Sequence, residues 1–319
     1  MPHTSALSQP ADVPSWGDRR CLIGSMLRLR VAKTDRTRNK KASPQPGWLK
    51  RQNAQEHLAV FVGAGVAFGC GLPDWEELIR RLAEAAFPGS DADEALRPFS
   101  PIARTRVIRN ALGKRFNTAV ADALYANAYT ISPAVKAIVS AGVRRICTYN
   151  FDDLLEEALT VHGVPFESLG PGDKLNITSN ETIVFHPHGI LSATMTPEEC
   201  AVQRLVLSEE DYHQLYSNPY SWANLVQLWL LMTYSCVFVG VSLTDPNIRR
   251  LLDTCRSLPI AHQHFAIIRT PTSGLPPGSH KLGKELIRAH ESDLRSLGVE
   301  PIWIEDFAEA AQLFRYVRR

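Results

Sequence analysis

The chain has 319 residues, 45% of them apolar, and a formal net charge of +2 at pH 7, so it can bury a sizeable core and its charge favours no class of partner. Its longest apolar stretch, residues 225–234, is too short to span a bilayer, which needs about twenty residues, and residues 1–16 lack the pattern of a secretory signal. Six scattered cysteines fit a reducing compartment, so we expect a cytoplasmic protein.

Residues 1–53 are predicted to form a basic arm outside the folded domain. Between residues 17 and 51, eleven basic residues stand against two acidic ones. The Pro, Ser and Thr content and the absence of a sustained hydrophobic period predict disorder, or order only with a partner. Two interpretations stay open: a solvated tail, or a surface for nucleic acid or an acidic protein.

A glycine-rich turn follows the first strand-like run, residues 58–62. Glycines let a backbone approach a ligand closely, and the N–H groups at a helix N-terminus favour an anion. A strand, a glycine turn and a helix start therefore predict a phosphate cradle, although the same pattern also serves a simple tight reversal of the chain. The turn and the residues before the helix-patterned stretch 75–87 include Gly63, Ala64, Gly65, Val66, Gly71, Pro73 and Asp74.

From residue 54 onward, apolar runs alternate with helical stretches, which predicts a Rossmann-like α/β fold, a parallel sheet flanked by helices. About eighty residues separate the first two runs, too many for one crossover, so residues 88–142 are predicted to form a small helical subdomain that covers the ligand crevice. Arg104, Arg106 and Arg109 are placed on its solvated face. We assign residues 54–319 to one domain, with strands near 58–62, 144–148, 182–186, 235–240, 264–268 and 299–304.

Three further polar clusters also follow strand-like runs. Ligands of open α/β sheets bind outside the carboxyl ends of the strands, so four clusters at four strand ends predict one shared crevice. The residues concerned are Asn150 and Asp152 after the second run, His188 after the third, and Gly240, Ser242, Asp245 and Asn247 after the fourth.

Each cluster has a structural alternative. Asn and Asp terminate strands and cap helices, and Asp245 can begin a helix with Pro246 at its first position. His186 and His188 form a His-x-His pair that invites a metal interpretation, but no carboxylate or cysteine ligand lies close to them in sequence. We therefore predict no metal site.

In their order and spacing, the four clusters resemble the motifs of sirtuin-type NAD-binding domains over about residues 55–255. Tyr149, Ala67 and the pair Trp75-Glu76 depart from those motifs, and no two cysteines are close enough to build the zinc ribbon of deacylating sirtuins, so no zinc is expected. The chain is most similar to the divergent zinc-less branch, which in bacteria is associated with NAD-degrading effectors of antiphage defence. The matching residues are Gly63, Ala64, Gly65, Gly71, Pro73, Asp74, Thr148, Asn150, Asp152, His188, Gly189, Gly240 and Ser242.

The resemblance implies a role for each matching position. The turn Gly63 to Val66 would hold the NAD pyrophosphate, with Pro73, Asp74 and Gly240 completing the cofactor site. Asp152 would accept hydrogen bonds from the nicotinamide carboxamide, and Asn150 would bind the ribose or orient water. His188 would act as general base, and Ser242, with Asp245 or Asn247, would contact the adenosine half.

The function implied is hydrolysis of NAD to nicotinamide and ADP-ribose by a regulated effector. Unchecked hydrolysis would kill the host cell, so we expect control by homo-oligomerisation or by a separately encoded partner protein. Two alternatives remain: a non-catalytic module that senses NAD or ADP-ribose, and an NAD-dependent deacylase or ADP-ribosyltransferase.

Overall fold

The N-terminal limit of the fold lies earlier in the chain than the sequence predicts. The computed structural model describes residues 46–175, 180–259, 262–271 and 280–318, so residues 1–45 of the predicted arm lie outside the described residues. Residues 46–53, which we had assigned to the arm, form helix α1 (Pro46–Ala54). Leu49 in this helix is 1% exposed, and the Asn53 amide donates to the carbonyl oxygens of Ala141 and Val317 at 2.7 and 3.1 Å. Helix α1 therefore belongs to the domain.

The core of the domain is a parallel sheet of seven strands in the order β3-β4-β2-β1-β5-β6-β7, and the predicted Rossmann-like fold is confirmed. Val62, at the end of β1, pairs with Thr148 on β2 and with Val239 on β5, so these three strands end level with one another. Strands β2 to β4 lie on one side of β1, and strands β5 to β7 lie on the other side. The ligand crevice is therefore expected at the carboxyl ends of β1 and β5, where the strand order reverses. The strands are β1 (Leu58–Val62), β2 (Arg145–Thr148), β3 (Phe166–Leu169), β4 (Thr182–Phe185), β5 (Ser235–Val239), β6 (His264–Arg269) and β7 (Val299–Ile304).

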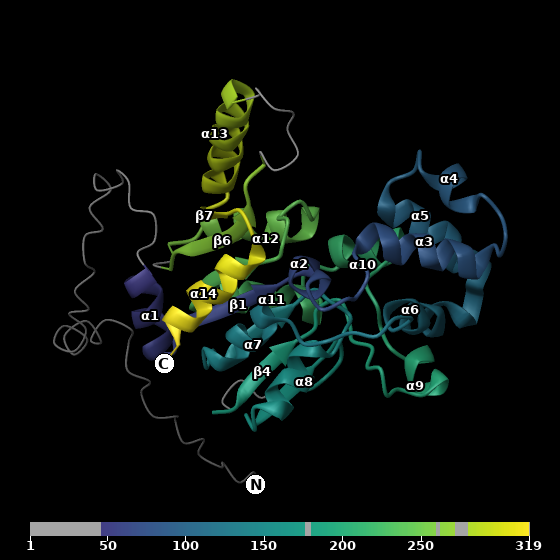
Figure 1. Cartoon of the computed structure of the whole chain (residues 1–319), viewed down its shortest axis with the longest axis horizontal. Helices are drawn as coiled ribbons and strands as arrows, with labels where there is room; N and C mark the ends of the chain where they lie inside the picture. The colour runs from purple at the N-terminus through teal and green to yellow at the C-terminus, as the bar shows by residue number, and fades with distance from the viewer. Residues whose placement is uncertain (1–45, 176–179, 260–261, 272–279, 319) are drawn as a thin grey trace, which may run out of the picture. The chain divides into compact units, whose positions relative to one another are not determined.

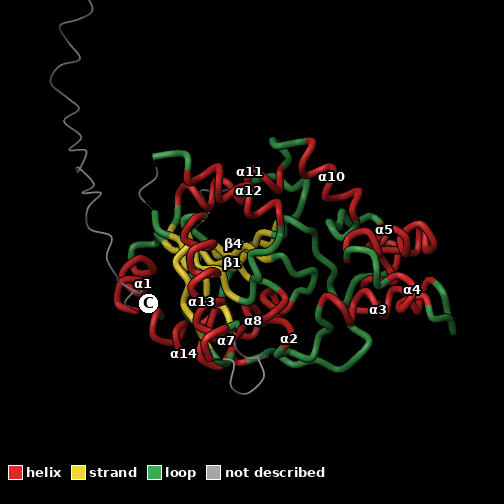
Figure 2. The backbone as a smooth tube through the Cα atoms, turned by 90° about the horizontal axis from the view of Figure 1, so that it is seen from above, coloured by secondary structure: helices red, strands yellow, loops and turns green. Residues whose placement is uncertain are grey.

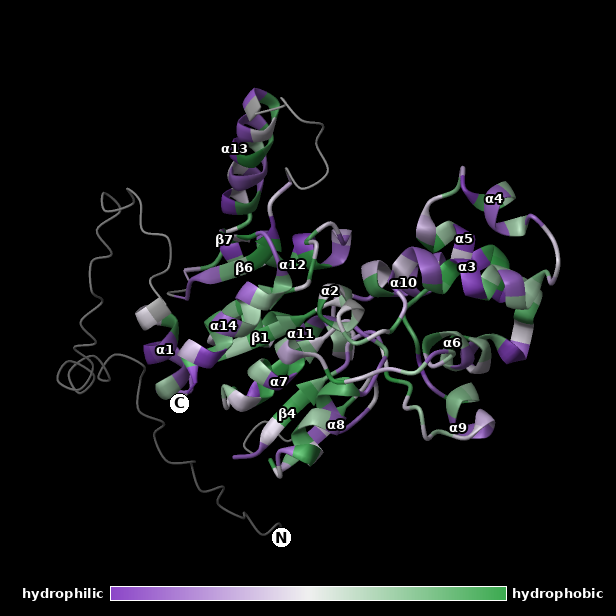
Figure 3. Ribbon diagram, in the orientation of Figure 1, coloured by the Kyte–Doolittle hydropathy of each residue, from purple (hydrophilic) through white to green (hydrophobic). Residues whose placement is uncertain are grey.

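Helices cover both faces of the sheet (Figure 2). Alternate residues of β1 enter two different cores: Val60 packs in one, and Phe61 packs in the other. Burial on both sides explains why inner strands such as β1 and β5 are continuous apolar runs, and Figure 3 shows β1 in green between its covering helices. One core includes α7 (Pro133–Ser140), α8 (Leu154–Val161) and α14 (Phe307–Val317); the other includes α11 (Trp222–Thr233), α12 (Pro246–Arg256) and α13 (His280–Ser296).

A separate apolar core supports the helical subdomain, seen on the right of Figure 1. It joins α3, α5 and α6 to apolar residues that follow β2 and β4, such as Phe151 and Leu191. Its limits differ from the predicted 88–142: α3 belongs to it, whereas α7 packs under the sheet through Val135 and Ile138. The helices of this region are α3 (Trp75–Ala86), α4 (Ala92–Leu96), α5 (Pro101–Leu112), the short 3-10 turn η1 (Gly113–Arg115), α6 (Phe116–Leu124), α9 (Pro197–Ala201) and α10 (Glu209–Ser217).

No helix in the described ranges is both long and apolar enough to cross a membrane.

Candidate functional site

The glycine turn after β1 and the turn after β5 touch each other. A Cβ atom at Gly63 would lie 2.5 Å from the carbonyl oxygen of Gly240, and one at Gly65 would lie 2.9 Å from the Gly240 Cα. Gly240 has φ +66, where a side chain would be strained. These three glycines are therefore required first by the contact of two turns, a reason that the sequence did not reveal.

The N–H groups of the predicted phosphate cradle are largely engaged within the protein. Gly63 donates to the carbonyl oxygen of Val239, Gly65 to that of Gly240, and Val66 to that of Gly63, each at 3.0 Å. Ala64 is exposed and starts the one-turn helix α2 (Ala64–Phe68). Binding of a pyrophosphate at this turn stays a prediction.

His188 lies between two tyrosine rings just beyond the end of β4. The centroid of its imidazole is 5.0 Å from the centroid of the Tyr149 ring and 5.9 Å from the centroid of the Tyr212 ring. The planes of the His188 and Tyr212 rings make an angle of 74°. The Tyr149 hydroxyl donates to Oε1 of Gln227 at 2.9 Å. Burial lowers the pKa of His188, although the negative charges of Asp245 and Asp211 act to raise it. The imidazole is therefore neutral at pH 7.

The backbone around His188 is held by the segment that follows α9. The N–H group of Val206 donates to the His188 carbonyl oxygen at 2.9 Å. Gly189 has φ +89, and a Cβ atom there would collide with the Arg204 carbonyl oxygen. The glycine of the His-Gly pair thus lets two chain segments approach, which fixes the position of the histidine.

Asn150 and Asp152 lie in the loop between β2 and α8. The N–H group of Asn150 is held by the Thr148 hydroxyl at 3.1 Å, and its side chain is half-buried. Asp152 is 6% exposed and accepts a hydrogen bond from the Leu154 N–H at 3.3 Å. Burial raises the Asp152 pKa to about 7, despite opposing contributions from that hydrogen bond and from His186. The helix-capping alternative is thus partly correct, because Asp152 does bind the start of α8.

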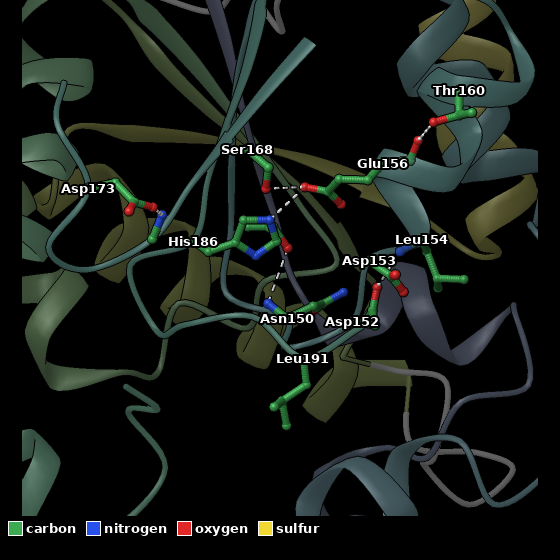
Figure 4. Close-up of polar contacts among 12 residues, drawn as sticks. Asn150, Asp152, Asp153, Leu154, Glu156, Thr160, Ser168, Asp173, His186 and Leu191 are labelled. Atoms are coloured by element: carbon green, nitrogen blue, oxygen red, sulfur yellow. Dashed lines mark hydrogen bonds and ion pairs between the residues drawn. The ribbon is translucent and has the colours of Figure 1, made fainter. Parts of the chain in front are cut away.

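His186 has a carboxylate partner that the sequence analysis missed. Its Nε2 lies 2.7 Å from Oε1 of Glu156, which also accepts a hydrogen bond from the Ser168 hydroxyl at 2.8 Å (Figure 4). His186 is fully buried, and Glu156 is 9% exposed. Burial acts to raise the Glu156 pKa, but the charge and hydrogen bond of His186, with the bond from Ser168, lower it overall.

The described residues contain no group of three or more His, Cys, Asp or Glu side chains placed to hold a metal ion.

The polar residues after β5 divide into two kinds. Ser242 is exposed, and its hydroxyl lies 2.7 Å from that of Thr244. Asp245 caps α12 by accepting from the N–H groups of Asn247 and Ile248 at 2.7 and 3.1 Å. Asn247 is 1% exposed and donates to Asn224 of α11 at 3.0 Å. Asn247 therefore packs α12 onto α11, whereas Ser242 is open to a ligand.

Pro73 and Asp74 form the entrance to the helical subdomain. Pro73 is half-buried, and Asp74 is exposed and caps α3 by accepting from the Glu77 N–H at 2.9 Å. Among the described residues, neither hydrogen-bonds to another predicted site residue. The structure thus gives Asp74 a structural role, and contact with the cofactor stays a prediction.

Three surface hollows of 560–700 Å³ in the described part of the chain lie away from the strand-end residues Asn150, Asp152 and His188, although Asp74 lines one of them. One runs along α12 from Thr244 to Thr254, next to the turn after β5. The other two lie on the helical subdomain and share Arg80 of α3. Contacts among the strand-end residues, rather than the size of a hollow, define the candidate site.

Residues 144–293 match the model of the SIR2-like domain. The predicted sirtuin-like resemblance is confirmed.

Among curated relatives, the NAD(+) hydrolase ThsA of Enterococcus faecium is 22% identical over 283 residues, 82% of this chain and 55% of the relative. Defense-associated sirtuin 2 of Bacillus subtilis is 24% identical over 206 residues, 63% of this chain and 19% of the relative. The chain therefore spans about half the length of this ThsA relative and about a fifth of the defence-associated sirtuin. A crystal structure of a Sir2 homologue in complex with NAD aligns with a TM-score of 0.41 and 15% identity, covering 84% of this chain and 92% of that one.

The sequence analysis missed the residues that surround the two histidines. Tyr149 was noted only as a departure from the sirtuin motifs, and Tyr212 was not predicted as a site residue. The departure at Tyr149 was a usable signal, because a changed residue inside a motif changes the surface of the site. Glu156 carried no signal, since it lies 30 residues from His186 in the chain.

Proposed function

We propose that this protein is an NAD hydrolase that cleaves the bond between nicotinamide and ribose, giving nicotinamide and ADP-ribose. The observation that carries the proposal is the setting of His188, which is a neutral imidazole packed between two tyrosines beyond the end of a central strand. The relatives named NAD(+) hydrolase ThsA support the choice of substrate.

The reaction needs a base that is neutral at physiological pH. As nicotinamide leaves, the C1–N electron pair goes to its ring nitrogen, and positive charge develops at ribose C1. The oxygen of water then bonds to C1, and a proton from that water passes to the base. His188 meets this need because its lowered pKa leaves the imidazole unprotonated.

The other predicted residues would bind and orient NAD around His188. Asn150 would hold the nicotinamide ribose or the attacking water, and Asp152 would accept hydrogen bonds from the carboxamide. The turn from Gly63 to Val66 would carry the pyrophosphate, and Ser242 would contact the adenosine half. Asn247 supports this arrangement indirectly, by holding α12 in place.

We further propose that the protein acts in the cytoplasm as an NAD-depleting effector of antiphage defence. The names of the relatives support this role. Hydrolysis would be restrained until assembly of several copies, or an activating partner protein, releases it. The basic arm within residues 1–53 would be one place for a partner, nucleic acid included, to bind.

Nicotinamide release from NAD by the purified protein, over a series of protein concentrations and with candidate triggers, tests the proposal. His188→Ala should lower the rate by about 10²–10⁴-fold, the usual contribution of a positioned acid–base group. Asn150→Ala should also lower it, because the group that would hold the ribose or the attacking water is removed. Tyr220→Ala is a matched control, because Tyr220 is 79% exposed. NAD binding without release in the parent protein would overturn the proposal in favour of a sensing module. A mass increase on an acceptor protein would favour ADP-ribosyl transfer.

A further inference from the structure

Tyr212 connects His188 to a second part of the site. It lies in the first turns of α10 and is 7% exposed. Its ring meets the His188 imidazole at 74° with 5.9 Å between the ring centroids, and the negative charge of Asp245, the cap of α12, acts on its hydroxyl. Helix α10 contacts α5 as well as α12. The Tyr212 side chain thus lies between His188, the candidate base, and Asp245, one of the residues predicted to contact the adenosine half.

The turn that carries Tyr212 is fixed by a carboxylate with several donors. Asp211 accepts hydrogen bonds from the Leu207 and Ser208 N–H groups at 3.1 and 2.9 Å and from the Ser208 hydroxyl at 2.8 Å. Arg109 of α5 donates to both Asp211 oxygens at 2.7 and 2.6 Å. Asp211 therefore joins α10 to the helical subdomain.

Arg109 is correspondingly more than a solvated residue. The sequence analysis placed it, with Arg104 and Arg106, on an exposed face. In the structure Arg104 is 5% exposed and bonds Glu76, whereas Arg106 bonds Glu209 and Glu210 of α10. Of these three arginines, Arg109 is the one that bonds Asp211, directly before Tyr212.

The position of Tyr212 determines how His188 is solvated. Its ring covers one side of the imidazole, and its hydroxyl interacts with the Asp245 carboxylate. Without the ring, water would reach the imidazole and stabilise its protonated form; without the hydroxyl, the Asp245 charge would be less compensated. Both changes would raise the His188 pKa. The groups that face His188 are Tyr149 from the end of β2, Tyr212 and Asp211 from α10, and Asp245 from α12.

We propose that Tyr212 is a positioning residue that keeps His188 neutral, and that Arg109, through Asp211, holds the turn of α10 that carries Tyr212. The inference rests on the proposed function only where a rate is measured. The protonation of His188 can be followed without any turnover.

The test titrates His188 by NMR in the full chain labelled at histidine, with the resonance assigned by its loss in His188→Gln. Tyr212→Ala should raise the His188 pKa toward the ordinary value near 6.5. Tyr212→Phe keeps the ring and should give a smaller rise. Tyr220→Ala should give none. The acid limb of the pH profile of nicotinamide release should move to higher pH in the same order.

Arg109→Gln and Arg106→Gln form a matched pair on one helix. Arg109→Gln should raise the His188 pKa, as Tyr212→Phe does. Arg106→Gln should leave this pKa unchanged, because Arg106 pairs with Glu209 and Glu210 rather than with Asp211. If Tyr212→Ala does not fold, Tyr212→Phe and Arg109→Gln decide the question. An unchanged His188 pKa in both would overturn the inference. A raised pKa in a protein that releases no nicotinamide would contradict the proposed hydrolase and leave the role of Tyr212 intact.

Discussion

Two histidines follow the end of β4 with one proline between them, and their surroundings differ in kind. His186 is fully buried, and its Nε2 lies 2.7 Å from a carboxylate of Glu156. His188 lies between two aromatic rings, and no described residue hydrogen-bonds to its ring nitrogens. A buried carboxylate partner commits a histidine to structure, whereas neighbouring aromatic rings leave its nitrogens free for chemistry. A His-x-His sequence alone cannot distinguish the two cases.

The largest expected effect is the loss of turnover in His188→Gln. The rate of nicotinamide release should fall by about 10²–10⁴-fold, because the base is removed. The melting temperature should stay close to that of the parent, since the imidazole has no hydrogen-bond partner among the described residues. An active His188→Gln protein would break the comparison, because His188 would then have no chemical task.

The second effect is a loss of stability in His186→Ala. Removing this ring leaves the Glu156 carboxylate buried without its partner, which should cost about 3–5 kcal/mol in the free energy of unfolding. Urea denaturation measures it. The double variant Glu156→Leu with His186→Phe, which removes both polar groups, should recover much of the loss. If His186→Ala were as stable as the parent but inactive, the assignments of the two histidines would be reversed.

A third prediction concerns Asp152, a buried carboxyl near His186 that forms no salt bridge with any described residue. Its pKa is raised to about 7 in the folded protein from an ordinary 3.8, so the folded state holds this proton more tightly than the unfolded state does. Its contribution to stability is therefore present at low pH and is lost as the pH rises toward 7. Asp152→Asn should remove this slope and be more stable than the parent at pH 8 by about 2–4 kcal/mol.

Urea denaturation of Asp152→Asn and the parent at pH 4.5, 6 and 8 measures the difference between the two slopes. The opposite sign is expected for Glu156, whose pKa is lowered, so that its contribution disappears as the pH falls. Parallel curves for Asp152→Asn and the parent would contradict the prediction.

The smallest effect is expected for Ser168→Ala. This change removes one of the two side-chain hydrogen bonds to Glu156 and should cost about 1–2 kcal/mol. Ser192→Ala is a control, because Ser192 is a partly exposed loop residue whose hydroxyl bonds to the neighbouring Thr194. A Ser168→Ala effect no larger than that of the control would show that His186 alone holds the carboxylate.

The central part of the fold could be predicted because its strands are buried on both sides. All six strands expected from apolar runs are present. Strand β3 was missed because it lies at the sheet edge, and three of its four residues are only partly buried, so its sequence lacks an apolar run. Helix α1 was missed because it is basic, and its attachment through Leu49 and Asn53 depends on partners far along the chain.

The candidate site could be predicted where its residues follow strand ends, and not where side chains meet from distant segments. The parallel strands place the loops of Asn150, His188 and Gly240 at the same carboxyl end of the sheet. The contact of Tyr212 with His188 depends on how α10 packs. The need for glycine at position 63 depends on the turn after β5. Such pairs leave no local pattern in the sequence.

The contact between the two glycine turns also separates the rigid parts of the site from those that can move. Gly63 and Gly65 are joined to the end of β5 by two backbone hydrogen bonds, with no room for a side chain between them. This part of the site is rigid, because the two turns cannot separate without breaking the hydrogen bonds at the carboxyl ends of β1 and β5. Helix α10, by contrast, is attached to α5 through side chains, including the Arg106–Glu209 and Arg109–Asp211 pairs and the contact of Ile102 with the cluster of Tyr212 and Leu215, so this attachment can change without disturbing the sheet.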